Sequence, residues 1–219
     1  LHIIDVSSQA SIRTFAQSWN AGGLPCDVLV NNAGCMPATR EESVDGLELS
    51  FATMAGGTFL LTALLLPSMQ SGKATPGAPA RVINVSSAGM YNFPINVKDL
   101  NSEKRSYDPA FVYAIAKRAQ VDLSVEWSRR LAALGLGDKV SVQSMHPGWA
   151  ITRGVKTQIP EFYEKEKNTM RSAEEGADTI VWLASAPQDV VDEAGGGNEK
   201  LSGGDVGISL GFASPPPPP

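Results

Sequence analysis

Short apolar runs alternate with longer amphipathic stretches along this chain. The runs at 27–30, 81–85 and 140–145 are bounded by Asn, Ser, Gly or Pro, and each predicts a strand. Residues 1–6 form a similar run, and we expect a further strand there. Strands that are apolar on both faces and joined by helices indicate a parallel sheet covered on both sides.

The longer stretches predict helices at 9–20, 44–69, 109–133 and 173–184. Asp108 followed by Pro109 is typical of a helix N-cap and first turn. Ser172 and Glu175 have the spacing of a capping box. Strand and helix therefore alternate, which is the pattern of an α/β protein.

Composition agrees with one folded body and narrows its partners. The chain has 219 residues, 42% of them apolar, and its 18 basic and 23 acidic residues give a net charge of −5. These charges are spread along the chain, so nothing favours nucleic acid or an anionic membrane surface. The longest apolar stretch, 58–67, is too short to span a bilayer, and we expect a cytoplasmic protein without a membrane span.

Two segments depart from this picture. Cys26 and Cys35 lack the spacing of a metal site, so we expect two reduced thiols and no metal.

Residues 188–219 are rich in glycine and end in five prolines, which predicts a flexible tail with a polyproline II end after a domain at 1–187. Such a tail either docks an SH3-type or profilin-like partner or is simply a disordered or artefactual terminus.

Tyr113 and Lys117 are the residues that suggest chemistry. Four positions apart on a predicted helix, they lie on one face, where an ammonium favours the phenolate and tunes the tyrosine as a proton donor and acceptor. Ser86 and Ser87 close the strand upstream, where a hydroxyl can orient a carbonyl. The pair alone is common on solvated helix faces, so the motifs around it decide its meaning.

Those motifs follow one another in a specific order. Asn31-Asn-Ala-Gly34 closes a strand, Val85-Ser-Ser87 closes the next, and Pro147-Gly148 follows the last. In this order, over residues 1–186, the chain resembles the short-chain dehydrogenase/reductase family. Its nearest resemblance is to the retinol-dehydrogenase-like branch, through the motifs Phe51-Ala-Thr53, Ser144-Met-His-Pro-Gly-Trp149 and Gly176-Ala-Asp-Thr179.

The resemblance implies a Rossmann-like doubly wound parallel sheet and NAD(P)-dependent exchange of hydride with a carbonyl/alcohol substrate, with retinol-like or steroid-like alcohols suggested by the branch. It implies that Tyr113 is the general acid/base and that Lys117 lowers its pKa and holds the nicotinamide ribose, while Ser87 orients the substrate. Ser86 is then packed or caps a turn, and His146 is structural. The cofactor contacts implied by the family motifs, in addition to Tyr113 and Lys117, are Asp5, Asn31, Ala33, Gly34, Pro147, Gly148 and Thr152.

Two features depart from the family pattern. No glycine-rich phosphate-binding turn and no two strands precede Leu1, so we expect an N-terminally truncated sheet whose first strand lacks its neighbour. The residue that selects NAD or NADP lies in that absent part, and the choice is not readable. Met54 occupies the position of the family's catalytic asparagine, although a thioether donates no hydrogen bond.

Two functions therefore compete. The first is an oxidoreductase, with an inserted loop at 91–107 over the substrate pocket and a substrate lid at 153–171. The second is a non-catalytic relative that keeps the scaffold and acts by association, such as a homodimer formed through the long helices. Cofactor binding distinguishes them.

Overall fold

The computed structural model describes residues 1–71 and 78–194. Its centre is a parallel sheet of three strands in the order β1, β2, β3, with Val30 paired to Ile83 and Ile83 to Gln143. The strands are β1 (Val28–Asn31), β2 (Ala80–Val85) and β3 (Val140–Met145). The predicted strands at 27–30, 81–85 and 140–145 are therefore confirmed.

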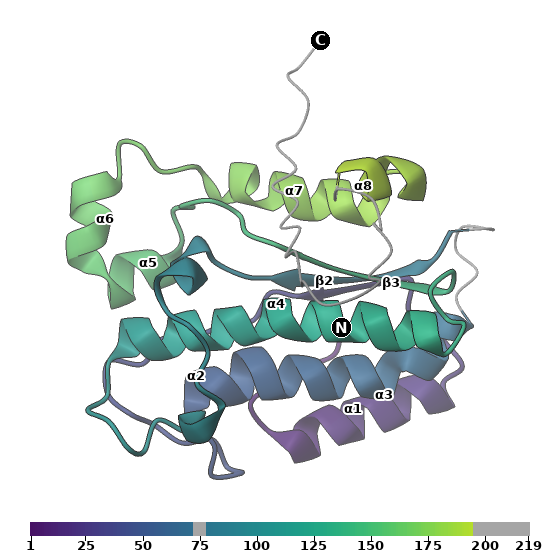
Figure 1. The fold of residues 1–219 in the computed structure, drawn as a ribbon, viewed down its shortest axis with the longest axis horizontal. Helices are drawn as coiled ribbons and strands as arrows, with labels where there is room; N and C mark the ends of the chain where they lie inside the picture. The colour runs from purple at the N-terminus through teal and green to yellow at the C-terminus, as the bar shows by residue number, and fades with distance from the viewer. Residues whose placement is uncertain (72–77, 195–219) are drawn as a thin grey trace.

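Helices cover both faces of this sheet (Figure 1). On one face lie α1 (Gln9–Ala21), α3 (Thr58–Gln70) and α4 (Pro109–Ala133), and on the other lie α7 (Ala173–Ser185) and α8 (Gln188–Ala194). The predicted Rossmann-like arrangement, with a parallel sheet covered on both sides, is confirmed for the described residues. The Asp108 cap and the capping box of Ser172 and Glu175 both form as expected.

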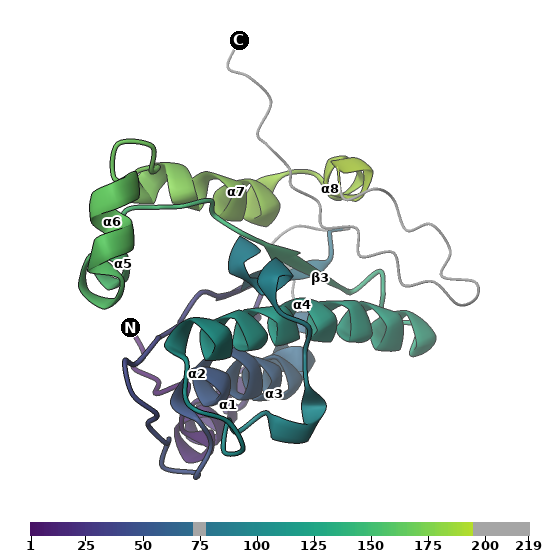
Figure 2. The same cartoon turned by 60° about the vertical axis from the view of Figure 1, so that its left-hand side comes forward.

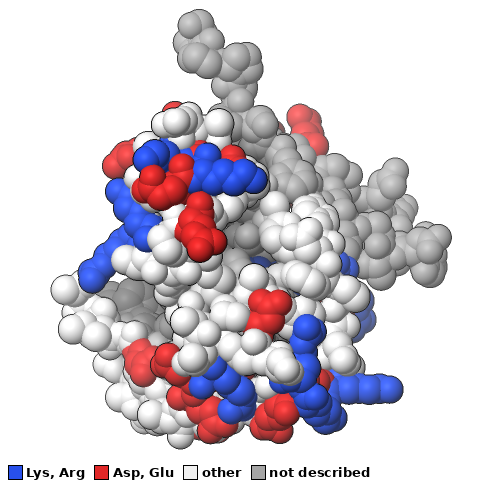
Figure 3. All heavy atoms as spheres, turned by 90° about the vertical axis from the view of Figure 1, so that its left-hand side faces the viewer, with Lys and Arg blue, Asp and Glu red and all other residues white. Residues whose placement is uncertain are grey.

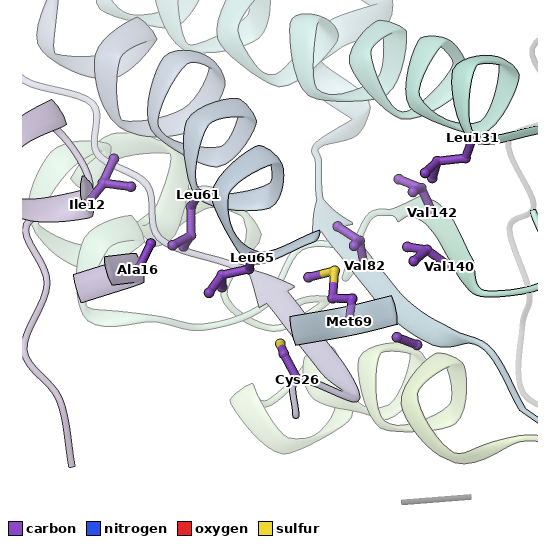
Figure 4. Packing of buried hydrophobic residues seen from close by; sticks show 11 residues of the cluster. Ile12, Ala16, Cys26, Leu61, Leu65, Met69, Val82, Leu131, Val140 and Val142 are labelled. Atoms are coloured by element: carbon purple, nitrogen blue, oxygen red, sulfur yellow. The ribbon is translucent and has the colours of Figure 1, made fainter. Parts of the chain in front are cut away.

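Two apolar clusters hold the layers together. The larger joins α1, α3 and α4 to the sheet, and Figure 4 shows Leu61, Leu65 and Met69 of α3 in it, together with Val82 of β2. The smaller joins Ile83 of β2 to α7 and α8. All six residues of β2 are buried, as expected for the central strand of a sheet covered on both faces.

A buried arginine fastens α7 to the sheet. Arg81 of β2 is 5% exposed, and its guanidinium donates to the carbonyl oxygens of Leu183, at 2.6 Å, and Ala186. These carbonyls belong to the last turn and C-cap of α7, where the helix leaves acceptors unsatisfied. Burial lowers the pKa of Arg81 from its ordinary value.

The predicted strand at 1–6 is wrong for the described residues. A strand needs a neighbour for its backbone groups, and β1 pairs only with β2 in the described sheet. Leu1 and Ile3 are exposed, and the chain first becomes regular at α1, where the Ser8 side chain accepts a hydrogen bond from the backbone N–H of Ser11.

The helix predicted from residue 44 begins five residues later. It runs through α2 (Leu49–Phe51), a π-helical turn η1 (Ala52–Gly57) and α3. Before it, Gly46 adopts φ +74 in a turn between Ser43 and Leu47, and Glu48 caps the helix. Together these elements form a 22-residue helix, Leu49–Gln70, with a mean hydropathy of 1.8. By length and composition it could span a membrane, but the buried core helices of other proteins reach the same values.

The described structure continues past the domain boundary predicted at residue 187. Helix α8 lies beyond it, and Val191 of α8 is buried in the smaller cluster. The folded body therefore extends to residue 194. The remainder of the predicted tail, with its five prolines, lies outside the described residues.

Candidate active site

The candidate site lies at the carboxyl ends of the three strands, where ligands bind in open α/β sheets. Figure 3 views the molecule from this side. Charged side chains gather above, where α5 (Arg153–Gln158) and α6 (Pro160–Glu166) lie, and along the lower part, while the band between them is mostly uncharged (Figure 3).

Helix α4 brings Tyr113 and Lys117 to this edge. Lys117 is only 3% exposed, and its Nζ donates to the carbonyl oxygen of Val85, the last residue of β2, at 2.6 Å. Its Nζ also lies 5.7 Å from the centroid of the Tyr113 ring. Burial lowers the pKa of Lys117 to about 8, because an ammonium is costly to remove from water.

Tyr113 contacts the serine that the sequence selects. Burial raises the pKa of the Tyr113 phenol, and its hydrogen bond with Ser87 acts in the opposite direction. Lys117 is directed to the Val85 carbonyl rather than to the phenol. In this geometry Ser87, and not Lys117, is the group that counteracts the raised pKa of Tyr113.

The two serines at the end of β2 have different roles. Ser86 is buried, and its hydroxyl donates to the Lys117 carbonyl oxygen at 2.8 Å, which confirms the prediction that it is packed. Ser87 caps the 3-10 turn η2 (Ala88–Asn92) by accepting from the Gly89 N–H, and it also reaches Tyr113. Of the two serines, Ser87 is the one that reaches the Tyr113 phenol.

The end of β1 contributes one structural residue and an open backbone. Asn31 is buried, and its Nδ2 donates to Asn84 Oδ1 at 2.7 Å, which ties β1 to β2. Ala33 and Gly34 follow and are exposed. A Cβ added at Gly34 would lie 3.1 Å from Met54 Sδ and 3.7 Å from Lys117 Nζ, so a glycine permits close approach at this point.

Met54 lies next to this glycine. It is fully buried in the π-helical turn η1. Such turns often occur at functional sites in helices. A thioether at this point provides no hydrogen-bond donor.

The two cysteines are unpaired thiols. Cys26 is buried and Cys35 is half-buried, and burial raises the pKa of both. Within residues 1–71 and 78–194, no group of His, Cys, Asp and Glu side chains could hold a metal ion.

The turn after β3 is shaped by a glycine. Gly148 has φ +75, and its N–H donates to His146 Nδ1 at 3.1 Å. Arg171 donates to the Pro147 carbonyl oxygen and would lie 3.0 Å from a Cβ at Gly148, so a side chain there would be both strained and crowded. Burial and Arg171 lower the pKa of His146, which agrees with a neutral structural imidazole.

The predicted lid at 153–171 forms two short helices. The Thr152 side chain caps α5 by accepting from the Val155 N–H. Trp149, which is 54% exposed, packs edge-on against Phe162 of α6 with ring centroids 5.1 Å apart. A backbone bridge between Ala150 and Arg171 closes the base of this segment.

Asp5 lies in the turn before α1. It is exposed and accepts hydrogen bonds from the backbone and hydroxyl of Ser7, which close this turn. The loop expected over the substrate pocket, 91–107, mostly crosses the opposite side of α4 and is fastened near the start of α2. The loop follows contacts made by the buried Glu48, a residue that the sequence analysis did not single out.

Comparison with known proteins shows the family of this chain. A family model described as short chain dehydrogenase matches residues 2–161. The chain belongs to the short-chain dehydrogenase family. A dehydrogenase/reductase SDR family member 12 from Bos taurus is 40% identical over 187 residues, covering 85% of this chain and 55% of that relative.

Further relatives place the chain in the retinol-dehydrogenase-like branch. Retinol dehydrogenase 14 from Homo sapiens is 36% identical over 192 residues, covering 84% of this chain and 54% of that relative. The chain thus spans about half the length of the curated relatives it matches. The Pseudomonas aeruginosa RhlG/NADP active-site complex has a TM-score of 0.59 and 26% identity, covering 84% of this chain and 69% of that one.

Proposed function

We propose that the protein containing this chain is an NAD(P)-dependent oxidoreductase that interconverts an alcohol and a carbonyl compound. The observation that carries the proposal is the place of Tyr113 beside Ser87 at the end of β2, with the buried ammonium of Lys117 5.7 Å from the centre of the phenol ring. A phenol and a hydroxyl that lie side by side can both hydrogen-bond to the oxygen of one substrate, and the phenol can take up or return the proton of that oxygen.

The residues present fit the nicotinamide end of such a cofactor. Gly34 and Gly148 keep side chains out of the ends of β1 and β3, and the buried ammonium of Lys117 lies close to Gly34. The cofactor would supply the hydride acceptor or donor. The glycine-rich turn for the pyrophosphate is not in this sequence, so cofactor binding belongs to the whole protein.

Within the site, each side chain has one task. Ser87 donates to the substrate oxygen and fixes its position. In alcohol oxidation, ionised Tyr113 accepts the hydroxyl proton as the C–H hydride leaves, and in reduction neutral Tyr113 returns that proton to the oxygen. Lys117 stabilises the phenolate once its ammonium turns from the Val85 carbonyl toward Tyr113. The name of the human relative suggests an apolar alcohol such as a retinol as substrate.

The buried thioether of Met54 favours a second candidate, a non-catalytic relative that acts by association. Titrating the whole protein with NADH and NADPH, while following nicotinamide fluorescence, separates the two. The oxidoreductase binds one of them and turns over alcohols. A folded protein that binds neither overturns the enzyme proposal.

A further inference from the structure

A buried serine joins the end of β2 to α4. The hydroxyl of Ser86 donates to the carbonyl oxygen of Lys117 at 2.8 Å. In Figures 1 and 2, the short turn η2, which follows Ser86 and Ser87, lies beside the first half of α4. The contact is therefore one residue away from Ser87 on the strand side, and on the helix side it is made by Lys117 itself.

The hydrogen bond from Ser86 is not needed to satisfy α4. The carbonyl of Lys117 lies in the interior of this 25-residue helix, where it accepts from the N–H group four residues further on. A carbonyl oxygen has a second lone pair, and the hydroxyl of Ser86 uses it. The bond therefore fixes one point of α4 against the end of β2 rather than completing the helix.

The backbone of Ser86 is fixed as well. Its N–H donates to the carbonyl oxygen of Met145, the last residue of β3, at 2.7 Å. Met90 of η2 is buried, and its Sδ lies 3.6 Å from the Ser86 hydroxyl, where a thioether is only a weak acceptor. Strand β3, helix α4 and turn η2 thus hold Ser86 from three elements.

The two neighbours of Ser86 meet the two functional side chains of α4. The carbonyl oxygen of Val85 accepts from Lys117 Nζ at 2.6 Å, and Ser87 lies beside Tyr113. Ser86 stands between these neighbours and bonds to the backbone of the same helix. Since the phenol precedes the lysine by about one helical turn, a shift of α4 along β2 would move both side chains away from their partners together.

Burial alone would not favour a hydroxyl at this position. Alanine would leave no polar group to satisfy, whereas a buried hydroxyl without a partner costs free energy. The hydroxyl of Ser86 is satisfied only while α4 keeps the Lys117 carbonyl within hydrogen-bond distance. The serine therefore favours one placement of α4 on β2 over others.

The chemistry proposed for the site is sensitive to this placement. Tyr113 exchanges a proton with an oxygen that Ser87 holds, and such a transfer needs heavy atoms about 2.6–3.2 Å apart. A displacement of about 1 Å can lower a rate about a hundredfold. A residue that fixes the distance between Tyr113 and Ser87 therefore affects turnover without touching the substrate.

We propose that Ser86 is a positioning residue, which keeps Tyr113 beside Ser87 by bonding the backbone of α4 to the end of β2. The effect of Ser86 on turnover rests on the proposed oxidoreductase function, whereas its effect on the surroundings of the phenol does not. The two effects can therefore be measured apart.

Ser124 provides a matched control. It is a buried serine of α4 whose hydroxyl donates to the Gln120 carbonyl oxygen at 2.7 Å and accepts from Asn84 Nδ2 of β2 at 2.8 Å. It stands about 16 Å further along the helix than Tyr113. Ser86→Ala and Ser124→Ala both remove a buried hydroxyl between β2 and α4, so both should lower the urea concentration at which half of the protein unfolds.

The first measurement needs no cofactor. With difluorotyrosine in place of tyrosine in the whole protein, the fluorine NMR signal that is lost in Tyr113→Phe reports how this phenol titrates. Ser86→Ala should raise the pKa of the Tyr113 phenol further, because the phenol moves away from Ser87, whose hydroxyl lowers that pKa. Ser124→Ala should leave the titration unchanged, and so should Ser86→Thr, which keeps the hydroxyl.

The second measurement is steady-state alcohol oxidation by the whole protein. Ser86→Ala should lower kcat at least about tenfold and leave KM within about twofold, because Ser86 positions the reacting groups and does not touch the substrate. Ser86→Thr should return kcat to within about threefold of the wild type, and Ser124→Ala should stay within about twofold of it.

The proposal is overturned if Ser86→Ala and Ser124→Ala behave alike in the titration or in kcat, or if Ser86→Thr behaves as Ser86→Ala does. A whole protein that binds no nicotinamide cofactor and oxidises no alcohol contradicts the proposed function instead, and the fluorine titration still decides the role of Ser86. Circular dichroism confirms that each variant is folded. If Ser86→Ala does not fold, Ser86→Cys takes its place in both measurements, because a thiol keeps the shape of the side chain but is a weak donor.

Discussion

At the scale of single residues, the chemistry rests on the phenol of Tyr113. We expect Tyr113→Phe, in the whole protein, to reduce turnover by about a thousandfold or more, because it removes the proton donor and acceptor. Cofactor affinity should stay within about twofold, since the ring itself is kept. Steady-state kinetics beside a nicotinamide fluorescence titration measure both.

Tyr91→Phe is the matched control, because Tyr91 is exposed in the turn after Ser87. It should leave the rate unchanged. An unchanged rate in Tyr113→Phe would remove this residue from the mechanism.

Met54 provides a gain-of-function prediction. Its side chain lies fully buried beside Gly34, which is also close to Lys117 Nζ, and an amide at this position could hold a hydrogen-bonded path for protons. Met54→Asn should raise the turnover rate about tenfold, in the lower part of what proton-transfer groups contribute. Met54→Leu keeps the site apolar and should not raise it. Equal rates in the two variants would mean that protons reach Tyr113 by another route.

Lys117 predicts how stability depends on pH. Its folded pKa of about 8 lies below the ordinary value of 10.5, so between these pH values the unfolded chain binds the proton that the folded chain has lost. The contribution of Lys117 to the free energy of unfolding should therefore rise from about pH 8 to about pH 10.5, by up to about 3 kcal/mol, and stay constant below pH 8.

Urea unfolding of the wild type and of Lys117→Met at a series of pH values measures this contribution. The difference between the two proteins should change across that window and be flat below it. The raised pKa of Tyr113 lowers the free energy of unfolding as the pH rises, but only at pH values where tyrosines ionise. Tyr113→Phe in the Lys117→Met background therefore separates the contribution of the tyrosine from that of the lysine. A difference that is constant from pH 7 to 10.5 would contradict the buried, readily neutralised ammonium.

At the scale of elements, Arg81 connects the sheet to α7. Arg81→Met removes charged donors from the carbonyls of Leu183 and Ala186, and each such bond is worth about 1.5–3 kcal/mol. We expect amide exchange in α7 and α8 to quicken more than tenfold, while exchange in α4 stays near its original rate. Hydrogen exchange followed by mass spectrometry resolves these helices.

Arg13→Met removes an exposed arginine of α1 and is the matched control. Its exchange pattern should equal that of the wild type. Uniform quickening across all helices in Arg81→Met would mean that the arginine supports the whole fold rather than the docking of α7.

Elements with local signals were predictable from sequence. The bounds of α4 follow from Asp108 and Pro109 at its start, and β3 and α7 are bounded by similar caps and turns. Elements that depend on distant partners were not. Residues 1–6 have the composition of a strand but no described neighbour, and α8 is ordered by burying Val191 against residues far away in the chain.

Within the candidate site, too, the residues with local sequence signals were predictable and the contacts between distant residues were not. Ser87, Tyr113 and Lys117 were predictable because each lies at a fixed point of an element whose signal is local. The direction of the 91–107 loop was not, since it depends on Glu48 and Tyr107, which are distant in sequence and meet only in the folded chain. The hydrogen bond from Lys117 to the Val85 carbonyl oxygen could not be predicted either, because it depends on how α4 packs on β2.

At the scale of the whole molecule, the outer sides of α3 and α4 are the surface on which we propose that a second copy docks. Phe59 is 41% exposed and stacks on Trp127 with ring centroids 5.3 Å apart. Arg118 and Asp122 of α4, 3.8 Å apart, lie on the outward side, and Arg118 Nε is buried without a hydrogen-bond partner. In a two-fold interface each of these charges can meet its opposite on the other copy, so the pair is self-complementary.

Sedimentation of the whole protein over a range of concentrations tests this surface. Wild type should form a dimer, and Phe59→Glu should shift it to a monomer with a dissociation constant raised at least about a hundredfold, because a carboxylate cannot be buried among the apolar groups of the interface. Val181→Glu places the same charge on α7, on the other face of the sheet, at a residue that is 61% exposed, and should remain a dimer. Loss of association in both variants would indicate that added charge alone disperses the protein, and a monomeric wild type would leave α3 and α4 without a partner of their own kind.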